Sequence, residues 1–137
     1  ETDNQWKSLH NLDWPEVVIT FVSNNTVRIA ARGLSRRYDY AELGMKDGRK
    51  IDEPNKQWRA LEYLADFGEI SWKSGSKDPK HLGKDRIRAL RKTLKRVMGI
   101  DQDPFEPYRK VKAYKPRFIL VASIEKQNSV VRSTHAW

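Results

Sequence analysis

Basic side chains are concentrated on one predicted helix, residues 84–99, which reads KDRIRALRKTLKRVMG. Apolar residues recur there at helical spacing (Ile87, Leu90, Leu94 and Val97), which predicts a helix with one buried stripe. The other positions are mostly cationic: Lys84, Arg86, Arg88, Arg91, Lys92, Lys95 and Arg96. A helix that packs on one side and is positive on the other is suited to binding polyanions such as nucleic acids. With that stripe buried, Arg88, Lys92 and Lys95 are expected to point outward, with Arg91 and Arg96 at the flanks, and Arg88 and then Arg91 are the candidates for base contacts. The alternative is a basic helix that is only solvated.

The excess positive charge comes from one third of the chain. The 137 residues include 27 Lys and Arg against 18 Asp and Glu, a net charge of +9. Residues 73–117 hold 15 basic and 5 acidic residues, a net charge of +10, so the remainder carries −1. This localisation is expected of a protein that binds phosphate backbones, and double-stranded DNA is the predicted partner. A membrane surface fits less well, because the apolar positions of the helix lack the aromatic residues of interfacial helices.

Several other elements are expected to position this helix. Residues 16–22 and 26–31 are rich in β-branched residues and flank the turn residues Ser23-Asn24-Asn25, which predicts a hairpin. Tyr38, Tyr40 and Leu43 suggest a further strand. A second helix is expected to begin at Pro54 or Asn55 and to end at Gly68. The predicted core joins the two helices through Leu61, Leu64, Ile87, Leu90 and Leu94.

A second basic segment follows the cationic helix. Residues 73–83 form a loop by composition, whereas residues 108–111 and 117–122 predict two strands of a hairpin. We expect the hairpin to contact phosphates or the minor groove through Lys110, Lys112, Lys115 and Arg117. The alternative is that these cations protect an edge strand from aggregation.

This order of elements predicts an α+β fold, a winged helix-turn-helix. Residues 87–94, IRALRKTL, resemble the recognition-helix pattern of OmpR/PhoB-type winged-helix effector domains, found in response regulators and related transcription regulators. The resemblance implies an N-terminal antiparallel sheet, a recognition helix at residues 84–98 and a C-terminal β-hairpin wing at residues 108–121. It also implies sequence-specific binding of double-stranded DNA by a transcriptional regulator. The expected organisation is an N-terminal extension (1–15), a winged-helix domain (16–122) and a C-terminal tail (123–137).

No catalytic motif competes with this interpretation. The sequence has no cysteine, no Gly-rich phosphate loop, no HExxH and no G-x-S-x-G. His10, His81 and His135 lie far apart, and Asp101 and Asp103 lack the glycine and distal glutamate of a calcium loop. No apolar run approaches the ~20 residues that a membrane span needs. We therefore expect a cytoplasmic protein that is not an enzyme and needs no cofactor or metal.

The rival function is a winged-helix module that binds another protein, such as a separate regulatory domain, without contacting DNA. Its apolar contact would come from exposed tryptophans. The candidates are Trp6, Trp14, Trp58, Trp72 and Trp137.

Overall fold

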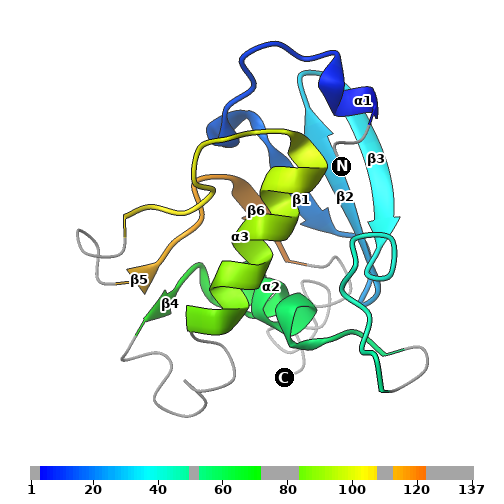
Figure 1. Ribbon diagram of the computed structural model, residues 1–137, viewed down its shortest axis with the longest axis vertical. Coiled ribbons are helices and arrows are strands. Elements are labelled where there is room, and N and C mark those ends of the chain that lie inside the picture. The colour runs from blue at the N-terminus through cyan, green and yellow to red at the C-terminus, as the bar shows by residue number, and fades with distance from the viewer. Residues whose placement is uncertain (1–3, 50–52, 72–83, 108–112, 123–137) are drawn as a thin grey trace, which may run out of the picture.

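A four-stranded sheet forms one layer of the fold, and the helices pack against one of its faces (Figure 1). The computed structural model describes residues 4–49, 53–71, 84–107 and 113–122. The strands are β1 (Val18–Phe21), β2 (Thr26–Ala31), β3 (Leu34–Asp39) and β6 (Ile119–Val121), in the order β3-β2-β1-β6. Neighbouring strands are antiparallel except β1 and β6, which are parallel. The described part of the chain is therefore an α+β fold.

The predicted N-terminal hairpin is confirmed. β1 pairs with β2 so that Val18 lies opposite Ala30 and Phe21 opposite Val27. Successive side chains of a strand point to opposite faces, and the inward ones are buried, including Ile19, Phe21 and Ile29. The further strand, β3, starts earlier than predicted, because Arg32 and Gly33 turn the chain directly after β2 with φ angles of 50° and 82°. Tyr40 and Leu43 lie beyond its end and are buried in the core.

Both predicted helices are confirmed with their ends. α2 (Lys56–Phe67) is capped by Asn55, whose side chain accepts a hydrogen bond from the backbone N–H of Trp58 at 3.1 Å. It ends at Gly68, which has the left-handed φ of 83° common after a helix. α3 (Lys84–Met98) ends in the same way at Gly99, with a φ of 69°.

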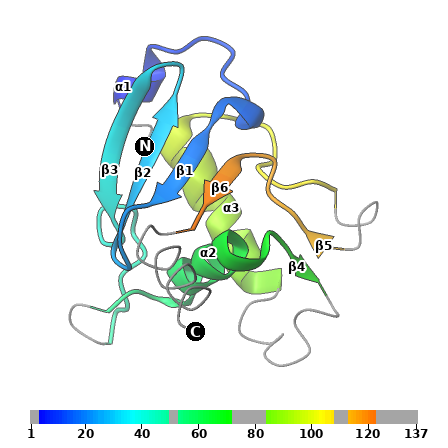
Figure 2. The ribbon, with the colours of Figure 1, turned by 180° about the vertical axis from the view of Figure 1, so that it is seen from behind.

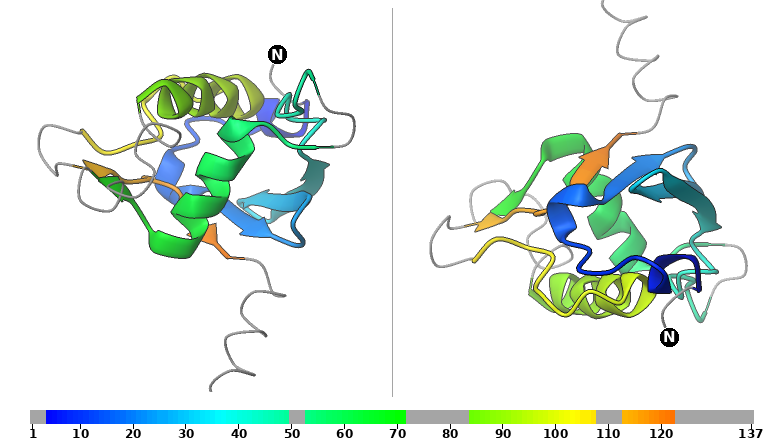
Figure 3. Two further views of the ribbon diagram at one scale, coloured as in Figure 1. Left: turned by 90° about the horizontal axis from the view of Figure 1, so that it is seen from below. Right: turned by 90° about the horizontal axis from the view of Figure 1, so that it is seen from above.

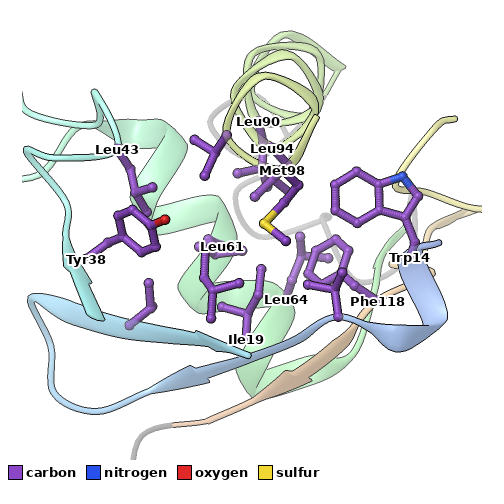
Figure 4. Close-up of a cluster of buried hydrophobic side chains, with 14 of the residues drawn as sticks. Trp14, Ile19, Tyr38, Leu43, Leu61, Leu64, Leu90, Leu94, Met98 and Phe118 are labelled. Carbon is purple, nitrogen blue, oxygen red and sulfur yellow. The ribbon is translucent and has the colours of Figure 1, made fainter. Parts of the chain in front are cut away.

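The core lies between α3, α2 and the inner face of the sheet (Figure 4). Leu61 and Leu64 of α2 meet Ile87, Leu90 and Leu94 of α3 there, as predicted, and each is at most 1% exposed. The N-terminal residues join the same core through α1 (Asn4–Lys7) and the 3₁₀ helix η1 (Trp14–Glu16). None of the described helices has the length and apolar character to cross a membrane.

The predicted C-terminal hairpin is wrong in its pairing. Residues 108–111 lie outside the described residues, but β6 joins the main sheet beside β1 instead of pairing with a preceding strand. β5 (Ala113–Tyr114) pairs with β4 (Ile70–Ser71), which lies between α2 and α3 in sequence. The physical reason is the burial of Phe118, which packs against Trp14 and Phe105 with ring centroids 5.8 and 6.0 Å apart. An exposed wing would leave this aromatic ring in water.

Candidate nucleic-acid interface

The solvent-facing side of α3 carries a stripe of cations. Ile87, Leu90 and Leu94 are completely buried on the opposite side of the helix. Arg88, Lys92 and Arg96 are exposed, and their spacing of four residues places them one above another on the same face. We name these three residues the α3 stripe.

The stripe differs slightly from the sequence-based expectation, which placed Lys95 outward and Arg96 at the flank. Lys95 is half-buried and Arg96 is exposed. The difference arises because Thr93 (8% exposed) and Met98 (2%) are also buried, which turns the apolar side of the helix toward them.

Arg91, a candidate for base contact in the sequence analysis, is held by an acidic neighbour. Its Nε donates to Asp103 Oδ1 at 2.9 Å, and its guanidinium lies 5.8 Å from the ring centroid of Phe105. Asp103 Oδ1 also accepts the backbone N–H of Phe105 at 2.9 Å. The pair fixes α3 to the loop that follows it, so Arg91 has less freedom to reach a ligand than the α3 stripe.

The two ends of α3 differ in how their cations are held. Near the C-terminal end, Arg96 lies beside the loop after β3, with its Nη2 3.5 Å from the carbonyl oxygen of Leu43. Near the N-terminal end, Arg86 is half-buried and its Nε has no hydrogen-bond partner. Lys84 begins the helix, but its side chain lies outside the part that the structure describes.

The cations of the predicted wing are only partly described. Lys110 and Lys112 lie outside the described residues. Lys115 follows β5 and is exposed. Arg117 is largely engaged within the protein: its Nη2 lies 3.4 Å from Asp13 Oδ1, and its Nη1 donates to the carbonyl oxygen of Asp103 at 3.2 Å. Asp103 therefore contacts both Arg117 and Arg91.

The acidic partner of Arg91 was missed by the sequence analysis, which considered Asp103 only as a possible calcium ligand. The two residues are twelve positions apart, so helical spacing could not predict the contact. Arg28 and Arg37 were also not considered as candidate binding residues. The signal for Arg28 was available, since it occupies the polar position in the alternating segment TVRIAA.

No group of three His, Cys, Asp or Glu side chains among the described residues is placed to hold a metal ion. A cleft of about 620 Å³ lies between the N-terminal segment and the end of α3, but its lining contains no His, Ser, Thr or Cys. Its Asp13 and Arg117 pair with each other. Comparison of the chain with family models, curated proteins and solved structures gave no match.

Proposed function

We propose that this protein binds double-stranded DNA in a sequence-specific manner, as a transcriptional regulator, with α3 as the helix that enters the major groove. The observation that carries this proposal is the α3 stripe. Its three cations are exposed on a helix whose other side is anchored in the core by residues with 0% exposure. A rigid helix with a cationic outer face has the width and charge that the major groove accepts.

Position along the helix suggests which cations contact bases and which contact phosphates. The N-terminal part of a recognition helix usually reaches deepest into the groove, so Arg88 is the first candidate for a base contact. Lys92 replaces Arg91 as the second candidate, because Asp103 holds Arg91. Arg88 and Lys92 are separated by ~6 Å along the helix, close to two base-pair steps. Lys95 and Arg96 are assigned to phosphates.

One part of the expected winged helix-turn-helix supports this role of α3, the packing of a preceding helix against it, although β6 pairs with β1 instead of forming the predicted wing. α2 packs against α3, and the short sheet of β4 and β5 contacts α2 through β4 (Figure 1). Lys115 follows β5 directly and is exposed, so among the described cations of residues 108–117 it is the best placed to contact phosphate. Lys110 and Lys112 are proposed to act with it.

The alternative function, a module that binds only proteins, loses its main support. Trp6, Trp14 and Trp58 are at most 1% exposed, and each indole N–H donates a hydrogen bond inside the protein. Trp72 and Trp137 lie outside the described residues. The expectation that the tryptophans form an exposed contact is therefore wrong for the three that the structure describes.

The test is a comparison of Arg88→Ala with a matched control. Arg59→Ala is suitable, since Arg59 is exposed on α2 and has no ion-pair partner among the described residues. A preferred site is first selected from random duplexes with the wild-type protein. We expect Arg88→Ala to lose about 1–3 kcal/mol of binding free energy on that site and little on scrambled DNA. Arg59→Ala should bind both duplexes like the wild type.

Two outcomes would contradict parts of the proposal. An equal loss on both duplexes would make Arg88 a phosphate contact. No binding by the wild type at 50 mM salt would reject DNA binding altogether, because phosphate contacts strengthen steeply as salt is lowered.

A further inference from the structure

The outer face of the sheet points away from α3 (Figure 2). The strand register places two arginines side by side on it. In the register of β2 and β3, Arg28 lies directly opposite Arg37, and Thr20 of β1 lies opposite Arg28 on its other side. Residues that are direct partners across strands point to the same face, with Cβ atoms about 4.5–5.5 Å apart. Arg28 and Arg37 are both exposed.

This arrangement is unfavourable for folding, because like charges directly opposite each other on a sheet repel. The other two arginines of the same hairpin are each neutralised. Arg32 pairs with Glu16 at 2.8 Å, and Arg36 pairs with Glu42 at 3.2 Å. Arg28 and Arg37 have no ion pair with any described residue. The hairpin therefore leaves these two arginines unneutralised on one face, which favours an external anion.

The groups around the arginine pair are suited to phosphate oxygens. Thr20, Thr26 and Ser35 occupy outward positions on β1, β2 and β3, and none of their hydroxyl groups has a hydrogen-bond partner within the described residues. Arginine, serine and threonine are common donors to the phosphates of nucleic acids. Asp39 also lies on this face, at its margin, where its Oδ1 accepts the backbone N–H of Glu42 at 2.8 Å.

The two basic surfaces point in opposite directions. Figure 3 shows α3 on one side of the fold and the sheet on the other, so a single duplex lying along the α3 stripe does not reach Arg28 and Arg37. We propose that the outer sheet face, centred on Arg28 and Arg37, binds the phosphate backbone of a second nucleic-acid segment, so that one molecule holds two duplexes. The first duplex is the one that α3 binds under the proposed function, and this inference rests on that function.

A nucleic acid fits this face better than a membrane surface does. The outward positions of the four strands include the aliphatic residues Val18, Ile119 and Val121 but no aromatic residue that would anchor in lipid headgroups. The same lack of aromatic rings disfavours base stacking by a single strand. The backbone of a duplex requires neither.

The decisive variant is Arg37→Glu, because we expect it to raise thermal stability and to weaken phosphate binding at the same time. It replaces the repulsion with an ion pair to Arg28, which should raise Tm by about 1–4 °C. It also places a carboxylate where we propose that a phosphate binds. Arg59→Glu on α2 is the control, with the same change of charge outside the sheet.

Binding to one and to two duplexes is measured separately. Fluorescence anisotropy with a labelled 20-base-pair duplex reports single-duplex affinity. Capture of that duplex on beads that carry a second, unlabelled duplex reports bridging. We expect Arg37→Glu to retain single-duplex affinity within about threefold and to reduce capture at least tenfold, whereas Arg59→Glu captures like the wild type.

Other results would overturn the inference in distinguishable ways. If wild type and Arg37→Glu capture the second duplex equally, the outer face does not bind nucleic acid. If anionic vesicles bind the wild type but not Arg37→Glu while no second duplex is captured, the face binds lipid instead. Failure of the proposed function is detected in a different measurement: the variant Arg88→Ala/Lys92→Ala would then bind a single duplex with the affinity of the wild type.

Discussion

Replacing Leu90 with alanine tests the orientation of α3, on which the choice of its solvent-facing cations depends. Leu90 has 0% exposure and projects from α3 into the core, where Leu61, Leu64 and Leu94 are also at most 1% exposed (Figure 4). The substitution removes three buried carbon atoms, a transfer free energy of about 2.4 kcal/mol at ~0.8 kcal/mol each. The cavity adds to this cost, because residues of two helices and a sheet line the site and limit its collapse.

We therefore expect Leu90→Ala to lower the free energy of unfolding by about 3–5 kcal/mol. For a chain of this size the loss corresponds to a fall in Tm of about 10–20 °C, measurable by circular dichroism or calorimetry. The control is Ile119→Ala, an aliphatic truncation at a site that is 51% exposed, which should cost about 1 kcal/mol or less. A Tm for Leu90→Ala within about 3 °C of the wild type would show that this side of α3 is not buried. Arg88, Lys92 and Arg96 would then no longer be assigned to the solvent.

Three further predictions concern polar contacts. Asp103→Ala should release Arg91 and raise DNA affinity, and the slope of log affinity against log salt should steepen by about 0.9 for one added phosphate contact. The same variant should lower the free energy of unfolding by about 1 kcal/mol. Unchanged affinity and slope would show that Arg91 does not reach DNA even when free. The hydrogen bond from Arg32 holds the pKa of Glu16 below its ordinary value of 4.5, so this stabilisation is present above that pH and is lost as the pH falls through the lowered pKa. The wild type should melt above Glu16→Gln at pH 7, with a difference that shrinks at acidic pH; a constant difference from pH 7 to pH 2 would exclude the ionised contact as its source. Asn55→Ala should cost about 1 kcal/mol in chemical denaturation through loss of the α2 cap, and a variant as stable as the wild type would show that the cap contributes nothing.

The elements that local signals specify were predictable from the sequence. The apolar period of residues 87–97 gives the buried side of α3, and Gly99 supplies the left-handed residue that ends the helix. Asn55 and Gly68 mark α2 in the same way. The first hairpin follows from two segments rich in β-branched residues around a short turn. Each of these features depends on residues within a few positions of one another, so periodicity and capping rules are sufficient to find them.

Pairings between distant segments were not predictable from the same rules. Residues 117–122 have the apolar, β-branched composition of a strand whichever strand lies beside them, and the burial of Phe118 against Trp14 decides in favour of β1. The choice depends on a residue more than a hundred positions away. Likewise, the contact between Arg91 and Asp103 depends on how the loop after α3 folds back along the helix. Spacing along one helix cannot reveal it.

The count of basic residues in a segment therefore overstates the charge available to a ligand. Residues 73–117 carry a net charge of +10, yet Arg91 and Arg117, both within that segment, are held by Asp103 and Asp13 and connect parts of the fold. Residues 1–72, which show no excess charge by count, contain Arg28 and Arg37, and the fold leaves both without an acidic partner on an exposed face. The placement of carboxylates in the folded chain, more than the number of cations, determines which arginines can bind an anion. This argument selects Arg88 on α3, and it also selects the pair on the opposite side of the molecule that a count by segment overlooks.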